Sequence, residues 1–341
     1  MRVVIALLVS AGLIVTPHAA RDPIHIEGFD DDDVRLFGSG GTVAKTLPAT
    51  DKREIVTIGA ATLPVSRDRF VRAVRDVVAF RRGKAIPQIG RFGVAPSLTD
   101  LETLTLDASD LRDLRDCAPA RCKIHLPQDV VEAVVAENGA SDRSNVDGRL
   151  TALFKTYLVR RVSAYLEGGR QALRAPMQRP GMKPADDIDA LLHASASYVD
   201  LAPHVFDHLR SFPERTTPDV EHALFWSKQD FGWKPVIALT HWALGPTAPE
   251  PGQPIVEASL QLYASHYVDA SLALMLIYEP SDPREAARAC RIVFIQRSRV
   301  KAVGGTFGAI VRRQIESRMR DGLRRYMQSL QARPLRAAGE S

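Results

Sequence analysis

Histidine side chains in the last third of the sequence are the residues best suited to acid–base chemistry. His266 lies in an apolar segment, and Asp269 follows three residues later at an expected turn. A histidine oriented by a carboxylate can act as a general base, because its pKa lies close to neutrality. His241 lies in a neighbouring apolar segment, and pairing of the two segments would put both imidazoles on one cavity wall. These three residues are the candidate catalytic group, with a buried structural histidine as the alternative.

The histidine spacing does not match an established metal-binding motif. His204 and His208 are four residues apart on an expected helix, a spacing that can chelate zinc, but no Glu follows the first as in H-E-x-x-H. His241 and His266 could bind a metal together with Glu279 or Glu257, but no local ligand spacing supports such a site. We therefore expect no metal site and no cofactor.

Two of the three cysteines are close enough in sequence to form a local disulfide. Cys117 and Cys122 flank Pro119, which favours a turn that can bring their Cβ atoms within bonding distance. The alternative is a pair of buried free thiols. Cys290 precedes an apolar run and is expected to be buried.

The N-terminus has the pattern of a secretory signal peptide. Arg2 precedes an apolar run from Val3 to Val15, and small residues follow up to Ala20. The run is shorter than the roughly 20 residues needed to span a bilayer. We expect cleavage near Ala20 and a periplasmic or secreted mature protein, with an uncleaved anchor as the alternative. Residues 21–52 carry an Asp run and several glycines with little apolar periodicity, so we expect a flexible linker.

The composition of the 341 residues is that of an ordinary globular protein. Apolar residues make up 45% and charged residues 25%, which excludes a mainly disordered, collagen-like or disulfide-dense chain. We expect a single domain over 53–335 and a disordered tail over 336–341. The segment 297–336 holds 11 basic residues against two acidic ones. That basic stripe fits an anionic membrane surface, or simply a solvated helix face, and we expect no nucleic-acid partner.

The order of expected elements indicates an α+β fold. A strand over 54–62 is followed by a helix after Ser66, and residues from about 126 to 212 form a helical insertion. Four strand-like segments follow, with spacing typical of an antiparallel meander. They span 235–244, 254–267, 270–278 and 291–300. A long amphipathic helix over about 307–330 ends the domain.

Strand alternation suggests which side chains face an interior ligand. Within 257–267, uninterrupted alternation puts His266 on the same face as Leu260, Leu262 and Ala264. The opposite face holds Glu257, Ser259, Gln261, Tyr263, Ser265 and Tyr267. The candidate ligand-contacting residues are Trp242, Tyr263, His266, Tyr267 and Phe307. The aromatic cluster over 225–233 is interpreted as packing at a helix-to-strand junction, with a pocket lining as the alternative.

Two stretches carry a resemblance to a known superfamily. Residues 55–70 give a strand, a Pro-containing turn and a helix, and residues 264–274 lead through a meander to the terminal helix. This order resembles the START/polyketide-cyclase (SRPBCC) superfamily, over about half of the chain. Segments 264–267 and 297–305 also look like those of a family of exported bacterial proteins. The resemblance implies a helix-grip-like fold, in which an antiparallel sheet wraps on the C-terminal helix and encloses an apolar ligand.

These features predict a periplasmic carrier for a hydrophobic, lipid-like molecule held between the sheet and the C-terminal helix. Apolar burial contributes about 25 cal/mol per Å², so such ligands need few polar contacts. One alternative is a hydrolase or cyclase that uses a His-centred acid/base pair. Another is an envelope docking protein that has no ligand and binds through its basic helix.

Overall fold

The computed structural model describes residues 28–333 except 143, 175–176, 179–181, 216, 231, 233, 251, 301–302 and 304–307. The expected signal peptide over 1–20, the ligand candidate Phe307 and the expected tail over 336–341 lie outside the described residues.

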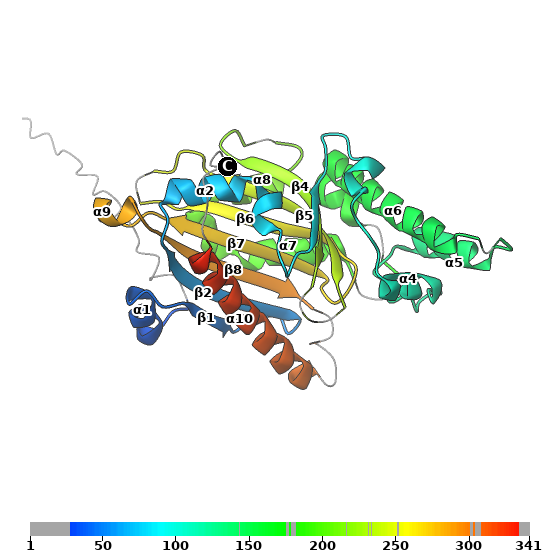
Figure 1. Cartoon of the computed structure of the whole chain (residues 1–341), viewed down its shortest axis with the longest axis horizontal. Coiled ribbons are helices and arrows are strands. Elements are labelled where there is room, and N and C mark those ends of the chain that lie inside the picture. Colours follow the sequence, from blue (N-terminus) through cyan, green and yellow to red (C-terminus); the bar gives the residue numbers. More distant parts are fainter. Residues whose placement is uncertain are drawn as a thin grey trace, which may run out of the picture.

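One antiparallel sheet of eight strands forms the centre of the molecule (Figure 1). The strands are β1 (Val43–Leu47), β2 (Glu54–Leu63), β3 (Gln88–Arg91), β4 (Glu221–Gln229), β5 (Val236–Gly245), β6 (Ile255–Ala264), β7 (Ala270–Tyr278) and β8 (Cys290–Arg299). Their spatial order is β1-β2-β8-β7-β6-β5-β4-β3, and every neighbouring pair is antiparallel. The α+β class and the antiparallel meander from β5 to β8 are therefore as the sequence predicts.

Helices cover both faces of this sheet. They are α1 (Asp31–Gly38), α2 (Arg67–Arg75), α3 (Val77–Arg81), α4 (Ala108–Arg115), α5 (Gln128–Gly139), α6 (Val146–Gly168), α7 (Pro184–Ala194), α8 (Pro203–Ser211), α9 (Pro283–Ala286) and α10 (Gly308–Ala332), with 3₁₀ turns η2 (Leu98–Leu101), η3 (Gly169–Arg174) and η4 (Ala196–Leu201). Among the described residues, no helix combines the length and apolarity that crossing a membrane requires.

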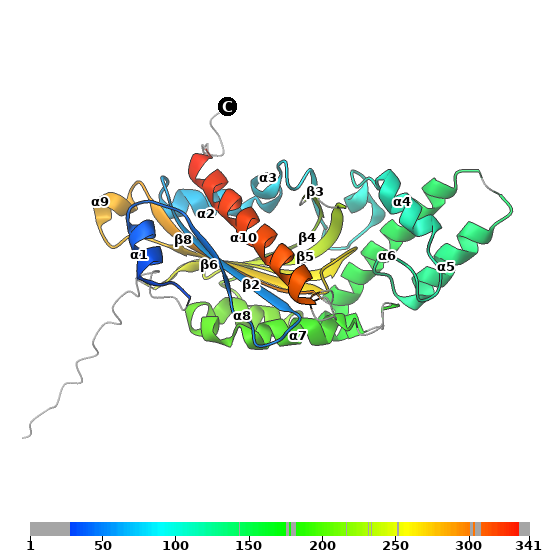
Figure 2. The same ribbon diagram turned by 90° about the horizontal axis from the view of Figure 1, so that it is seen from below.

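The two faces carry separate apolar cores (Figure 2). On what we call the α10 face, α2, α3 and α10 pack over the sheet and bury residues such as Phe70 and Met327. On the opposite α8 face, α6, α7 and α8 pack over the larger core, which includes Phe154 and Phe206. The helices α4, α5 and the first part of α6 extend beyond the sheet as an arm (Figure 2). Because both faces are covered, β7 is buried at every position.

The predicted linker over 21–52 is wrong for residues 31–47. The Asp run begins α1, where Asp30 caps the helix by accepting hydrogen bonds from the backbone of Asp32 and Asp33. Acidic residues in a first turn also interact favourably with the helix dipole. After α1, β1 joins the edge of the sheet beside β2. Both elements are short and partly exposed, so they lack the apolar periodicity by which the sequence could have shown them.

Two further segments differ from the expectation. The imperfect alternation of residues 101–106 suggests a strand, but the segment begins at the end of the 3₁₀ turn η2 and continues without strand structure. A capping box between Ser97 and Asp100 closes that turn. The first two aromatic residues of the cluster, Phe225 and Trp226, belong to β4, an inner strand between β3 and β5, whereas residues 231 and 233 lie outside the described residues. The alternation of β4 is hidden because Ala223 to Lys228 are all buried.

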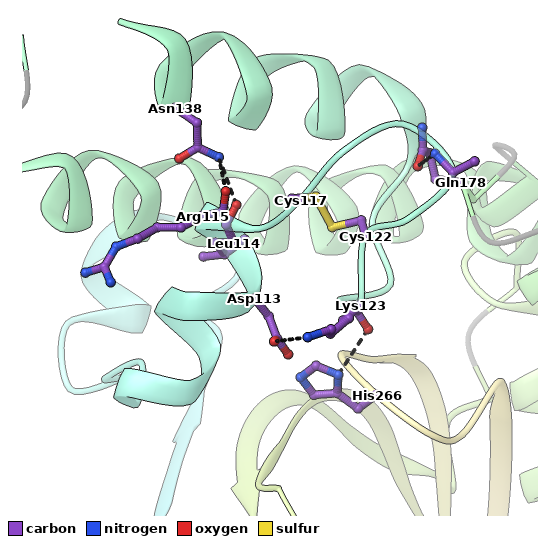
Figure 3. Close-up of a disulfide and its surroundings, with 10 residues drawn as sticks. Asp113, Leu114, Arg115, Cys117, Cys122, Lys123, Asn138, Gln178 and His266 are labelled. Carbon is purple, nitrogen blue, oxygen red and sulfur yellow. Dashed lines mark hydrogen bonds and ion pairs between the residues drawn. A yellow bond between two sulfur atoms is a disulfide. The ribbon is translucent and has the colours of Figure 1, made fainter.

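The predicted cysteine pair is present at the base of the arm (Figure 3). The Sγ atoms of Cys117 and Cys122 lie at bonding distance and close the turn after α4. Asn138 of α5 donates to the backbone oxygens of Leu114 and Arg115, which fixes the end of α4 beside α5. Cys290 is buried as a free thiol.

Candidate metal centre

Three histidines from three elements meet on the α8 face. His208 comes from α8, His222 from β4 and His241 from β5. One ring nitrogen of each lies within 4.8 Å of the others. Antiparallel pairing sets His241 opposite Leu224, two residues from His222, so the two strand histidines are diagonal neighbours on one face. Helix α8 buries Val205, Phe206 and Leu209 against the sheet, and this orientation points His208 to the same place.

The spacing of the ring nitrogens suits a tetrahedral metal ion. His208 Nε2 and His241 Nε2 are 3.3 Å apart. Two nitrogens bound to Zn²⁺ at 2.0–2.1 Å with tetrahedral angles are separated by about 3.3–3.4 Å. The ring centroids of the three pairs are 4.9 to 5.4 Å apart. The two nitrogens therefore already lie at the separation that a shared metal ion demands.

Aromatic neighbours hold the ring of His241 in place. The hydroxyl of Tyr165 lies 2.8 Å from His241 Nδ1. Phe212 stacks on Tyr165, with ring centroids 5.3 Å apart, and contacts His241 at 4.6 Å. When His241 binds a metal through Nε2, its Nδ1 carries the proton and donates to the Tyr165 oxygen. Such an outer hydrogen bond is the usual way in which proteins orient a metal-binding imidazole.

A glycine allows α6 and α8 to approach each other at this point. Gly169 follows the end of α6 with φ of +55°, and a Cβ there would lie 2.3 Å from the carbonyl oxygen of Phe212. Only a residue without a side chain fits this contact. The close approach brings Tyr165, one turn earlier, against Phe212, and so builds the aromatic surround of His241.

Burial keeps these imidazoles in the neutral form that binds metals. Burial, together with the neighbouring His222, lowers the pKa of His208 to about 4. Burial likewise lowers the pKa of His222 and lowers that of His241 well below its usual value. The Nδ1 atoms of His208 and His222 are buried and have no hydrogen-bond partner among the described residues. The cluster therefore offers uncharged nitrogen donors at neutral pH.

The expectation from the sequence was no metal site, whereas the structure brings together three histidines that the sequence did not group. His208 had been paired with His204, but His204 is half exposed and lies 3.3 Å from Asp219. His222 was not singled out at all. The sequence signal that could have found it is strand alternation, because His222, Leu224 and Trp226 share the α8 face.

The predicted catalytic group of His241, His266 and Asp269 does not assemble around one cavity. In the strand register, His241 lies opposite Leu260, while His266 lies six residues later, beyond the end of β6. The end of β6 is level with Ala238, three residues or about 10 Å along β5 from His241, and His266 lies farther on in the turn. Asp269 is buried, and its backbone N–H donates to the carbonyl of Arg299.

His266 instead belongs to a charged cluster that fastens α4 to the sheet (Figure 3). Its Nδ1 lies 3.2 Å from the carbonyl oxygen of Lys123, and its Nε2 lies 3.7 Å from a carboxylate oxygen of Asp110. The buried Lys228 and the partly exposed Lys234 also approach Asp110, at 3.9 and 3.6 Å. Burial alone raises the pKa of Asp110, but His266 and the two lysines outweigh it and the pKa is lowered.

The predicted ligand-contacting residues are divided between the two faces. Trp242 lies in the core of the α10 face, whereas Tyr263 lies in that of the α8 face, where it packs on Tyr157. The single-face assignment over 257–267 fails because Leu262 is an extra residue in β6. The register steps from Leu239–Tyr263 to Thr240–Gln261, which is a β-bulge that reverses the alternation. Tyr267 is partly exposed in the following turn.

Comparisons of the chain with protein-family models, with curated proteins and with solved structures returned no match.

Proposed function

We propose that this protein is an exported metalloprotein that binds a divalent zinc ion through His208, His222 and His241. The observation that carries the proposal is the 3.3 Å separation of His208 Nε2 and His241 Nε2, with a nitrogen of His222 within 4.8 Å of both. Neutral imidazoles are good ligands for zinc, and three of them leave one tetrahedral position for water or substrate.

The surroundings of the cluster favour a site that can perform chemistry. His208 and His241 are buried, but His222 keeps part of its surface exposed, which gives a fourth ligand a side from which to approach. A zinc-bound water at such a position loses a proton near pH 7 and becomes a nucleophile. Three-histidine zinc sites with an open position are typical of metal-assisted hydrolysis and hydration.

Export is supported by the cysteine pair. A disulfide between Cys117 and Cys122 persists in an oxidising compartment and is rare in a reducing one. The N-terminal pattern over 1–20 predicts the same compartment.

The hydrophobic carrier and the helix-grip arrangement stay predictions. We favour the metal site over the carrier because the inner strands beneath α10 carry many polar side chains, such as Ser259, Gln261 and Ser271. An acyl chain placed against them would leave hydroxyl and amide groups without hydrogen-bond partners. Docking of α10 on an anionic membrane surface also stays a prediction, with Arg313, Arg324 and Arg325 as its exposed cations.

The proposal is tested by zinc titration of the mature protein after dialysis against a chelator. Calorimetry is expected to show one tight site per chain, which His208→Ala and His241→Ala remove. His204→Ala is the matched control, because His204 lies one turn earlier on the same helix and is half exposed. Its zinc binding is expected to equal that of the unmodified protein.

Folding of each variant is checked by circular dichroism. Cobalt(II) bound to the unmodified protein provides a second test that needs no variant, because tetrahedral nitrogen ligation gives intense visible absorption. Absence of zinc binding, or equal loss of binding in His204→Ala, would contradict the proposal.

A further inference from the structure

Two rows of polar and small side chains cross the α10 face of the sheet. In each row the residues are direct partners on neighbouring strands. We call them the polar rows: the first is Ser298, Ser271, Gln261 and Thr240, and the second is Thr57, Gln296, Ala273 and Ser259. The first row runs from β8 across β7 and β6 to β5. The second runs from β2 across β8 and β7 to β6.

The polar rows contrast with the rest of the same face. Toward the other end of the strands, Ile255, Ile277 and Ile292 form an apolar surface that packs with Phe70 and Val74 of α2. The polar rows have no comparable apolar cover. Gln261 and Gln296 stay partly exposed although they lie on inner strands of the sheet. Solvent therefore reaches these two side chains, while the other six members of the polar rows are buried.

A buried ion pair borders the polar rows. Arg81 of α3 donates to Glu257 Oε1 at 2.6 Å and to Ser259 Oγ at 2.7 Å. Ser259 in turn donates to the same Glu257 oxygen at 2.7 Å. Arg81 also lies over the ring of Phe225, which is the direct neighbour of Thr240. The positive and negative charges offset each other, so the border adds no net charge.

Three buried polar atoms beside these rows have no hydrogen-bond partner among the described residues. They are Glu257 Oε2, Gln261 Nε2 and Trp242 Nε1. Glu257 is only 1% exposed and Trp242 only 3%. Leaving such groups unpaired costs about 1–3 kcal/mol each, which a ligand that hydrogen-bonds them would recover. One of these atoms accepts hydrogen bonds and two donate them.

From these observations we propose that the polar rows bind a neutral, hydroxyl-rich molecule of the saccharide class. Sugar hydroxyls both donate and accept, so they satisfy the carboxylate oxygen and the two N–H groups together. Amide, hydroxyl and carboxylate side chains beside aromatic rings, here Trp242 and Phe225, are suited to ligands with polar edges and apolar faces. An anionic ligand is disfavoured because Arg81 is already paired with Glu257. This site lies on the face opposite the histidine cluster and does not depend on the metal.

The probes for the test are three neutral hexasaccharides: maltohexaose, cellohexaose and N-acetylchitohexaose. Each is titrated into the metal-free mature protein, with saturation-transfer NMR and calorimetry as readouts, and palmitate serves as the apolar comparison. At least one hexasaccharide is expected to bind. Gln261→Leu and Trp242→Phe are each expected to weaken that binding about tenfold, since each removes one donor.

Gln314→Leu is the matched control, because it makes the same chemical change at an exposed position of α10. Its affinity is expected to be unchanged. Circular dichroism verifies that each variant is folded. Lack of binding by all three hexasaccharides overturns the proposal, as does binding that Gln261→Leu leaves unchanged. Binding of palmitate alone overturns it in favour of an apolar ligand.

Discussion

The chemistry of the candidate metal centre depends on single atoms. His241 has one ring nitrogen directed at His208 and the other at Tyr165, so both of its nitrogens have assigned roles. His208 and His222 keep their Nδ1 atoms unpaired among the described residues. A proton on Nδ1 of His241 leaves Nε2 as the ligand, and Tyr165 supplies the acceptor that fixes this tautomer.

The first prediction concerns this outer hydrogen bond. Tyr165→Phe removes the oxygen that accepts from His241 Nδ1 but keeps the ring that stacks on Phe212. We expect zinc affinity to fall about tenfold or more while the stoichiometry stays at one per chain. Competition with a chelator of known affinity measures the change.

Tyr157→Phe is the control for this prediction. Tyr157 lies on the same helix, is buried, and packs on Tyr263. Its replacement is expected to leave zinc affinity unchanged. Equal affinities for the Tyr165→Phe variant and the unmodified protein would show that Tyr165 does not position the metal ligand.

At the scale of elements, the site depends on how closely α6 approaches the segment after α8. Gly169 makes this approach possible through its positive φ and its contact with the Phe212 carbonyl. The glycine pair Gly168 and Gly169 is a local signal for the end of a helix, but it does not indicate that the turn packs on a residue more than forty positions later. Local sequence patterns report caps and periodicity, whereas this contact is a property of the tertiary fold.

Gly169→Ala is therefore expected to weaken both folding and zinc binding. The new Cβ meets the Phe212 oxygen and the backbone is held at positive φ, which together cost about 1–3 kcal/mol or more. Displacement of Phe212 and Tyr165 should also lower zinc affinity. Urea unfolding and zinc titration measure the two effects. Gly139→Ala is the control, since a Cβ there meets nothing within 4 Å, and it should change neither quantity.

The attachment of α4 to the sheet is electrostatic and should respond to pH. Asp110 lies among His266, Lys228 and Lys234, and its pKa is lowered in the folded protein. A carboxyl group with a lowered pKa stabilises the folded state above its unfolded pKa, near 3.8, and this contribution is lost as the pH falls through the folded value.

Asp110→Asn is expected to destabilise the protein by about 1–3 kcal/mol at pH 7, because it removes a buried carboxylate that faces His266 and two lysines. The loss is limited because Asp107 and Asp113 keep their closer ion pairs with these lysines. The difference from the unmodified protein should be constant above about pH 5 and should shrink below the usual carboxyl pKa. Denaturant unfolding at a series of pH values measures it. A difference that stays constant down to pH 2 would refute the assigned role of Asp110.

At the scale of the whole molecule, the sheet separates two sites of different chemistry. The histidine cluster lies on the α8 face and the polar rows lie on the α10 face. The antiparallel meander, the helical segment before it and the terminal helix follow from apolar patterning, and so the sequence predicted them. Which residues share a face did not follow, because the extra residue at Leu262 reverses the alternation of β6.

The difference between apolar patterning and the arrangement of strands also explains which site residues the sequence predicted. His241 was selected because a histidine in an apolar strand is unusual, and it does lie in the cluster. Its partner was sought in His266, on the next strand, whereas the structure supplies His222 from the strand on the other side. Choosing between these two neighbours requires the strand order, which spacing along the chain does not contain.

The compartment is a property of the whole chain and can be tested by counting thiols. After expression with its N-terminal segment and purification under non-reducing conditions, the denatured protein is expected to label one of its three cysteines with iodoacetamide. Reduction should raise the number to three. Mass spectrometry counts the labels, and three labels without reduction would contradict a Cys117–Cys122 disulfide.

The most direct test of the metal centre is a crystal structure of the zinc-loaded protein with data collected on both sides of the zinc absorption edge. The account predicts a single strong anomalous peak about 2.0–2.1 Å from one ring nitrogen each of His208, His222 and His241. An anomalous map without a peak between these three rings, from crystals grown with excess zinc, would contradict it.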